Sequence, residues 1–207
     1  MPETTSHSLL PALLKSRVVI IMRGVRPAEA VEMTETLVSE GISFIEIPLN
    51  SPDAMETIRL LAGKFHGSGI HVGAGTVLRA EDVSTLHGIG CEYVISPNTS
   101  VPVIRRTKET GMLSMPGFKT PTEAFTAIDA GADCLKIFPA GLPSDIKIMS
   151  AVIKLPIFAV GGVSSDNVRD YLKVASGVGI GGSVYKAGMS ADALRLAARE
   201  LLKRIAE

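Results

Sequence analysis

The chain has 207 residues, of which 46% are hydrophobic, and its 21 basic residues balance 21 acidic ones. This length favours one domain, the hydrophobic content excludes a disordered chain, and the neutral balance gives no reason to expect nucleic acid or a membrane surface as a partner. No apolar run reaches the roughly 20 residues that a membrane span needs, and the N-terminus lacks the pattern of a signal peptide. Cys91 and Cys134 lie in apolar segments and are interpreted as core thiols, which fits a reducing compartment. Without a targeting segment, the cytoplasm is the expected compartment.

Short runs rich in β-branched residues alternate with amphipathic runs along the whole chain. A helix is expected near residues 8–15, before the first strand. In order, the predicted strands are 18–22, 44–49, 70–74, 92–96, 112–116, 133–138, 156–160 and 178–182. The predicted helices between and after them include 27–40, 120–130, 165–175 and 190–207. The first of these begins at Pro27 and ends at Gly41, which are the start and stop signals expected of a helix.

Eight strands that are each followed by a helix are typical of a (β/α)8 barrel, the α/β fold of the TIM-barrel type. An open doubly wound sheet is the alternative, and the count of eight strands favours the barrel. No linker rich in proline, glycine or serine interrupts the alternation, so residues 1–207 are predicted to form a single barrel domain. Functional groups in such barrels sit at the carboxyl ends of the strands, so polar residues at these ends are the candidate site residues.

Lys136 lies at the centre of the sixth predicted strand, between Leu135 and Ile137. Since successive side chains of a strand point to opposite faces, Lys136 is predicted to point into the barrel together with Cys134 and Phe138. A lysine removed from water there has its pKa lowered, and a neutral amine can form a Schiff base with a carbonyl group. The alternatives are a structural ion pair with a carboxylate and a lysine that faces solvent.

Glu46 occupies the same kind of place on the second predicted strand, between Ile45 and Ile47. It is predicted to face the same cavity as Lys136, and two opposite titratable groups in one cavity are suited to proton transfer. The alternative is a buried ion pair between Glu46 and Lys136 without chemistry. That alternative is less favoured, because buried pairs are usually dispensable in apolar interiors.

Glycine-rich segments, "AVGGV" and "GIGGS", follow the last two predicted strands. Barrels often bind phosphate at these two loops through backbone N–H groups, and glycine permits a close approach. The candidate phosphate-binding residues are Gly161, Gly162, Gly182 and Ser183. The alternative is that these glycines only form tight turns with positive φ.

Arg23 follows the first predicted strand and Thr76 follows the third. An arginine can bind a carboxylate through two hydrogen bonds, and a threonine can add one more. The alternatives are a salt bridge at the rim for Arg23 and a helix N-cap for Thr76. The four histidines have no metal-ligand spacing and no Cys/His cluster occurs, so neither a metal nor another cofactor is expected.

The segments "FIEIPLNSP", "GAGTVL", "SPN", "PGFKTPTEA", "LKIFPA", "FAVGGV" and "GIGGS" occur in this order along the chain. From about residue 16 to the C-terminus, their sequence, order and spacing resemble the 2-keto-3-deoxy-6-phosphogluconate/galactonate aldolases. "RG" after the first strand, "IPLNSP" and "AVGG" most resemble the phosphogalactonate branch. In the phosphogluconate branch an arginine that binds the carboxylate ends the second strand, where this chain has Asn50.

The resemblance implies a metal-independent class I aldolase on a (β/α)8 barrel, usually a trimer, that cleaves a phosphorylated 2-keto-3-deoxy sugar acid to pyruvate and glyceraldehyde 3-phosphate. Carried over by motif, Lys136 would be the Schiff-base lysine and Glu46 the proton shuttle. Arg23 and Thr76 would contact the substrate near its carboxylate. The phosphate would be held by Gly161, Gly162, Gly182 and Ser183.

Other functions remain open from the sequence. The substrate could instead be the phosphogluconate epimer or 4-hydroxy-2-oxoglutarate. A phosphosugar isomerase, a barrel similar to thiamin-phosphate synthase or a non-catalytic phosphosugar-binding barrel would use the same phosphate loops. These last three need no imine and leave Lys136 as an ion-pair partner, so trapping with pyruvate and borohydride separates them from an aldolase.

Overall fold

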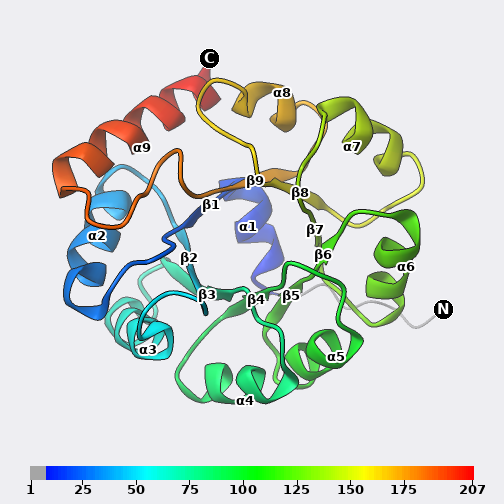
Figure 1. Cartoon of the computed structure of the whole chain (residues 1–207), viewed down its shortest axis with the longest axis horizontal. Helices are drawn as coiled ribbons and strands as arrows, with labels where there is room; N and C mark the ends of the chain where they lie inside the picture. Colours follow the sequence, from blue (N-terminus) through cyan, green and yellow to red (C-terminus); the bar gives the residue numbers. More distant parts are fainter. Residues whose placement is uncertain (1–7) are drawn as a thin grey trace.

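A computed structural model describes residues 8–207 of the chain. In this part the strands form an inner ring and most helices surround it (Figure 1). The strands are β1 (Val18–Ile21), β2 (Phe44–Pro48), β3 (His71–Gly75), β4 (Tyr93–Ile95), β5 (Leu113–Met115), β6 (Gly117–Phe118), β7 (Leu135–Ile137), β8 (Ile157–Val160) and β9 (Gly177–Ile180). All eight predicted strands are present, and the fifth is longer than predicted and divided into β5 and β6.

The ring of strands is closed at Pro116, where β5 continues along the chain into β6. The hydrogen-bonded order is β5-β4-β3-β2-β1-β9-β8-β7-β6, and Pro116 alone separates the two ends of this order, β5 and β6, in the sequence. Proline has no backbone N–H, so it interrupts the strand, but its carbonyl oxygen accepts a hydrogen bond from the Lys136 N–H at 2.9 Å. The predicted (β/α)8 barrel is confirmed, and the open sheet is excluded because both ends of the order belong to one strand.

The helices are α1 (Leu10–Ser16), α2 (Pro27–Ser39), α3 (Ala54–Phe65), α4 (Ala80–Gly88), α5 (Val101–Glu109), α6 (Pro121–Asp129), α7 (Pro143–Ser150), α8 (Val168–Leu172) and α9 (Ala191–Ala206). Proline begins α2, α6 and α7, where its missing N–H has no cost. The side chains of Thr120 and Ser190 cap α6 and α9. α8 is shorter at both ends than the helix predicted at 165–175, because residues 165–167 and 173–174 form turns instead.

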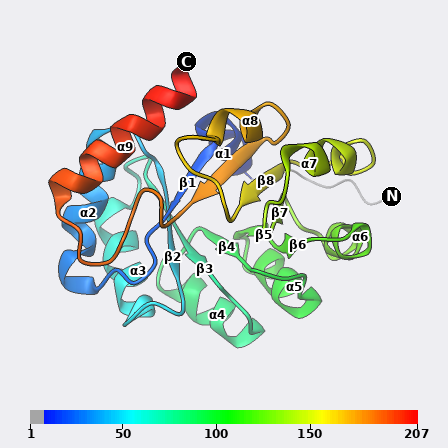
Figure 2. The ribbon, with the colours of Figure 1, turned by 45° about the horizontal axis from the view of Figure 1, so that its top comes forward.

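Helix α1 covers the end of the barrel at which the strands begin. It crosses the ring in Figure 1 and lies on its far side in Figure 2. Leu10 and Leu13 of α1 pack against the inward-facing rings of Phe44, Tyr93 and Phe158. The interior is therefore filled with apolar side chains at this end, and the opposite end, where the strands finish, is left for a site.

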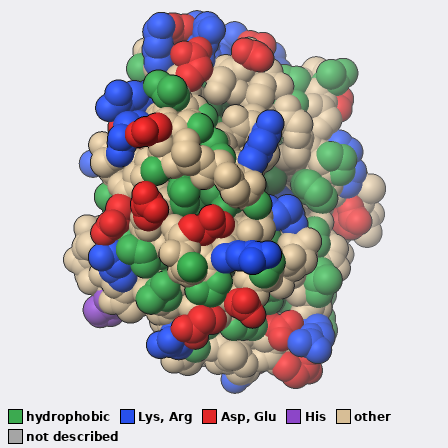
Figure 3. Space-filling model, turned by 60° about the vertical axis from the view of Figure 1, so that its left-hand side comes forward, with side chains coloured by type: hydrophobic (Ala, Val, Ile, Leu, Met, Phe, Trp, Pro, Cys, Tyr) green, Lys and Arg blue, Asp and Glu red, His purple; other side chains and the backbone are tan. Residues whose placement is uncertain are grey.

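The outer surface carries charges of both signs. In the view of Figure 3, acidic and basic side chains are interspersed with hydrophobic ones. Glu40, which follows α2, pairs with Arg195 and Arg199 of α9, and Glu35 of α2 pairs with Lys64 of α3. Exposed pairs contribute only about 0–1 kcal/mol each, so the helices are held mainly by their apolar faces. Within residues 8–207, every helix is too short or too polar to span a bilayer.

Candidate active site

Lys136 and Glu46 point into the same interior. Each is the middle residue of its strand, β7 and β2, and they are 6% and 2% exposed. Leu135 and Ile137 pack in the outer core, between the sheet and the helices, as the strand phase predicts. Among the described residues, Lys136 Nζ has no Glu46 carboxylate oxygen within 4.0 Å, the distance that defines an ion pair. The structural ion pair left open by the sequence is therefore not formed.

Burial is the largest influence on the pKa of both Glu46 and Lys136. Burial raises the pKa of Glu46, and the positive charges of Lys136 and Arg23 oppose that rise. Burial lowers the pKa of Lys136, the Glu46 carboxylate opposes this change, and the Arg23 charge adds to it. Both shifts favour the uncharged forms, so Lys136 approaches a neutral amine and Glu46 a carboxyl group that exchanges its proton more readily near neutral pH.

Glycines on β3 provide the space that Glu46 occupies. A Cβ atom at Gly75 would lie 1.6 Å from Glu46 Oε1, so this position admits no side chain. At Gly73 a Cβ atom would lie 2.2 Å from the Tyr93 ring. The Tyr93 hydroxyl donates a hydrogen bond to the Ile45 carbonyl oxygen at 2.7 Å. The "GAG" segment thus makes room for the carboxyl group, a role that the sequence analysis did not assign to it.

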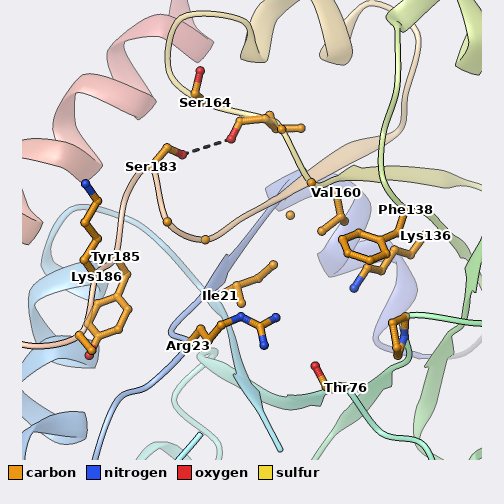
Figure 4. A pocket seen from close by; sticks show the side chains of 18 residues that line it. Ile21, Arg23, Thr76, Lys136, Phe138, Val160, Ser164, Ser183, Tyr185 and Lys186 are labelled. Carbon is orange, nitrogen blue, oxygen red and sulfur yellow. Dashed lines mark hydrogen bonds between the residues drawn. The ribbon is translucent and has the colours of Figure 1, made fainter. Parts of the chain in front are cut away.

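A cavity of about 700 Å³ opens at the carboxyl ends of the strands (Figure 4). Every predicted site residue lines it except Glu46, which lies deeper. In Figure 4, Arg23 and Thr76 lie on the same side of the cavity as Lys136, and Ser164 and Ser183 lie across from them. The cavity therefore has two polar ends, one at the lysine and one at the glycine-rich loops.

Arg23 does not form the salt bridge, and Thr76 is not the helix N-cap, that the sequence left open as alternatives. Arg23 Nη1 donates a hydrogen bond to Asn50 Oδ1 at 2.6 Å, and among residues 8–207 Arg23 has no carboxylate within ion-pair distance. The residue at the N-cap position of α4 is Arg79, so Thr76 is not the cap. The φ of Thr76 is 56°, a left-handed conformation that costs roughly 1–3 kcal/mol outside glycine and is concentrated at functional sites.

The two glycine-rich loops are joined and differ in what they require. The Ser183 hydroxyl donates a hydrogen bond to a carbonyl oxygen of the loop after β8 at 3.2 Å. Gly161 and Gly162 have φ of 89° and 86°. A Cβ atom at Gly161 would lie 3.0 Å from the Phe138 ring, whereas one at Gly162 or Gly182 would meet nothing within 4 Å. Gly161 is thus also required by packing, and Gly162 and Gly182 leave open space at the cavity.

Other residues at the cavity were not among the predicted site residues. They include Pro97, Phe138, Ser164 and Lys186. The Phe138 ring centre lies 4.8 Å from Lys136 Nζ and forms a wall beside it. Its sequence signal is its place two residues after the lysine, on the same strand face. Lys186 lies six residues after the end of β9, so its position in the sequence does not indicate a place at the cavity. The fold of the loop after β9 brings it there.

Within the described residues, no group of three or more His, Cys, Asp and Glu side chains is placed to hold a metal ion. His71 instead contacts Glu92, with 2.9 Å between Nδ1 and Oε2, at the end where the strands begin. His7 lies outside the described residues. The groups that the cavity offers are an amine, a carboxyl group, a guanidinium and backbone N–H groups, which suit carbonyl and anion chemistry.

Residues 11–197 match the model of a protein family described as KDPG and KHG aldolase. The chain belongs to this aldolase family. It is 44% identical over 182 residues to the probable 2-dehydro-3-deoxy-6-phosphogalactonate aldolase of Rhizobium meliloti, covering 86% of this chain and 85% of that protein. It is 39% identical over 183 residues to the 2-dehydro-3-deoxy-6-phosphogalactonate aldolase of Escherichia coli K12, covering 86% and 89%. A solved structure described as native KDPGal superposes with a TM-score of 0.88 at 38% identity, covering 91% of this chain and 94% of that one.

Membership of the KDPG and KHG aldolase family confirms the resemblance found in the sequence. The region that matches the aldolase family contains all eight predicted site residues, which run from Arg23 to Ser183. The roles of the individual residues stay predictions.

Proposed function

We propose that the chain is a class I aldolase that cleaves 2-dehydro-3-deoxy-6-phosphogalactonate to pyruvate and glyceraldehyde 3-phosphate. The observation that carries the proposal is Lys136, a buried amine with a lowered pKa that faces the cavity without an ion-pair partner and shares the barrel interior with Glu46. The names of the two relatives described above support the choice of substrate.

In the proposed reaction the neutral Lys136 amine attacks the C2 ketone, and loss of water gives a protonated imine. Glu46, directly or through a water, removes the proton of the C4 hydroxyl group. The C3–C4 bond then breaks, its electron pair passes into the imine as an enamine, and glyceraldehyde 3-phosphate is released. Protonation of the enamine at C3 and hydrolysis return pyruvate and the free lysine.

The two ends of the cavity match the two anions of this substrate. Arg23 and Thr76 are proposed to hold the carboxylate beside Lys136. The phosphate is proposed to bind at Gly161, Gly162, Gly182 and Ser183, through backbone N–H groups and the hydroxyl. The phosphate end is remote from the bond that breaks, so its binding free energy serves to position C4 near Glu46.

The function is tested by assaying pyruvate release from both C4 epimers side by side, with and without EDTA. The epimers share the pyruvate and phosphate ends, and one hydroxyl that still finds a partner costs only about 1–2 kcal/mol. We therefore expect cleavage of both, kcat/KM about tenfold higher for the phosphogalactonate compound, about 1.4 kcal/mol, and no effect of EDTA.

Two results of this assay would contradict different parts of the proposal. No pyruvate from either epimer would refute the aldolase. A preference for the phosphogluconate epimer would overturn the branch alone. Arg23→Ala should lower kcat/KM for both epimers alike because it acts at their common end.

Replacing Gly162 by aspartate is expected to raise KM for the phosphorylated substrate at least tenfold, about 1.4 kcal/mol. The new carboxylate would stand where the backbone N–H groups are proposed to receive an anion. Gly67→Asp is the matched control, because Gly67 has φ of 69°, has open space around a Cβ atom and precedes β3 at the far end of the barrel. An unchanged KM in Gly162→Asp would place the phosphate elsewhere.

We also propose that the protein is a homotrimer, as the family resemblance implies. Apolar side chains are exposed on the side of the barrel formed by α6 and α7. They are Phe125, Leu142, Ile148 and Val152. Side chains of this kind gathered on one side are suited to contact between copies of a chain.

Ile148→Asp is expected to lower the mass in solution measured by light scattering, because it places a charge at a proposed subunit contact. Ile148 is 70% exposed in the single chain and Leu196 of α9 is 67% exposed, so Leu196→Asp is a matched control on another side. A wild-type mass equal to one chain, or an Ile148→Asp variant with the wild-type mass, would contradict this proposal.

We propose further that residues 1–207 form one barrel domain and that the protein acts in the cytoplasm. The unbroken ring formed by residues 8–207 supports the first proposal. Two buried free thiols, Cys91 and Cys134, fit a reducing compartment and support the second.

A further inference from the structure

The loops that follow β1 and β2 are joined by two hydrogen bonds at the mouth of the cavity. Arg23 Nη1 donates to Asn50 Oδ1 at 2.6 Å, and the Gly24 N–H donates to Ser51 Oγ at 2.9 Å. The first bond is the shorter one, and its donor, Arg23, lines the cavity. None of the roles proposed so far uses Asn50.

The turn itself does not explain an asparagine at this place. Asparagine is common in turns because it tolerates positive φ. In the described chain, positive φ outside glycine occurs at Arg17, Asp53 and Thr76, so the backbone of Asn50 has no such requirement. The side chain of Asn50 is therefore explained by its partner, Arg23.

A neutral acceptor preserves the positive charge of Arg23. An aspartate or glutamate at the same place would also hold the guanidinium, but its negative charge would offset the positive one. An alanine would leave a long, exposed side chain free to turn away from the cavity. Asparagine provides orientation without neutralisation, which is what a guanidinium needs in order to receive an anionic substrate.

The positive charge of Arg23 also acts on the two buried groups behind it. Burial raises the pKa of Glu46, and the Arg23 charge opposes that rise. Burial lowers the pKa of Lys136, and the Arg23 charge adds to that lowering.

Three other titratable groups lie near this pair or on the cavity wall. Tyr93 is buried and feels the charge of Glu46. Tyr185 and Lys186 line the cavity, and the Tyr185 hydroxyl donates a hydrogen bond to Glu29 outside the lining. The cavity lining contains no acidic side chain that would compensate Arg23.

We propose that Asn50 is a positioning residue whose side-chain carbonyl holds the Arg23 guanidinium at the cavity mouth, as an undiminished positive charge for the substrate carboxylate. This inference rests on the proposed function. It gives a physical reason for asparagine at the end of β2, because in this chain the cation comes from β1 and the residue after β2 orients it.

Two variants of Asn50 separate orientation from charge. Asn50→Ala removes the acceptor, and we expect KM to rise about tenfold, as for the loss of one hydrogen bond to a charged group. Asn50→Asp keeps the shape and the acceptor but adds a negative charge. That charge raises the pKa of both Lys136 and Glu46, so the rising limb of kcat/KM against pH should move to higher pH. Leu196→Glu, on the exposed face of α9, adds the same charge away from the cavity and should leave the limb in place.

The decisive measurement is made in an Arg23→Ala background. If Asn50 acts through Arg23, adding Asn50→Ala there should change KM less than twofold, although it raises KM about tenfold in the wild type. The inhibition constant of inorganic phosphate, a probe of the opposite end, should be unchanged in Asn50→Ala. Circular dichroism tests whether each variant is folded. If Asn50→Ala is not folded, the nearly isosteric Asn50→Asp variant still tests the proposal through its pH profile.

The outcomes distinguish this inference from the proposed function. A wild-type protein that releases no pyruvate refutes the proposed function. A wild-type aldolase whose Asn50 variants keep the normal KM and pH profile overturns only the role of Asn50. Equal losses with and without Arg23, or a weaker phosphate inhibition in Asn50→Ala, would also overturn it, because they would indicate general loosening of the loop.

Discussion

Replacing Lys136 by arginine is expected to lower kcat by about 10⁴-fold or more, the scale seen when an enzyme loses its nucleophile. A guanidinium stays protonated at every working pH, so it cannot attack the C2 ketone. The wild-type protein treated with pyruvate and borohydride should gain a stable adduct on the peptide that carries Lys136, measured by mass spectrometry. The variant should gain none.

The interpretation requires that the variant is folded and that the label is specific. Lys108 offers a matched control, because it is a second partly buried lysine and pairs with Asp133 away from the cavity. Lys108→Arg keeps that charge pair and should keep both turnover and adduct. An adduct on any lysine other than Lys136, or turnover that survives in Lys136→Arg, would remove Lys136 from the proposed mechanism.

Glu46→Gln is expected to lower kcat by about 10²–10⁴-fold, because the amide has nearly the same shape but cannot take the C4 hydroxyl proton. KM should change little, since the carboxylate and phosphate ends of the substrate are held elsewhere. Steady-state kinetics on the phosphogalactonate compound measures both constants. Glu56→Gln on the exposed surface of α3 is the control and should behave like the wild type.

The stability of Glu46→Gln distinguishes lost chemistry from lost structure. The folded-state pKa of Glu46 is raised, so the favourable contribution of its protonated form is complete below the unfolded-state value near 4.5 and is lost as the pH rises through the folded-state pKa. Glutamine does not titrate, so the Tm of the variant should fall less than that of the wild type over this rise. A kcat within tenfold of the wild type would show that another group moves the proton.

The strand phases could be predicted because they depend on local sequence alone. Apolar neighbours on both sides of Lys136 and of Glu46 fix which face each polar side chain takes, and the period of two then directs both into one barrel. The glycine-rich loops could be predicted for a similar reason, since their position after the last two strands places them on one rim.

The remaining features depend on contacts between distant segments. The bond between Arg23 and Asn50 joins residues 27 positions apart, and neither residue alone indicates the other as its partner. The space for Glu46 comes from Gly75 on the next strand. The two parts of the fifth strand stand at opposite ends of the hydrogen-bonded order, and a pattern of hydrophobic residues contains no information on this closure.

Helix α1 has a consequence for the order in which the proposed products depart. Because this helix seals one end of the barrel, the cavity is a well with its mouth at the other end, and Lys136 lies inside it. The pyruvate half remains bonded to the lysine as an enamine after the C3–C4 bond breaks, while the aldehyde half is no longer bonded to the protein. Glyceraldehyde 3-phosphate must therefore depart first and pyruvate second, and in the direction of synthesis pyruvate must enter before the aldehyde.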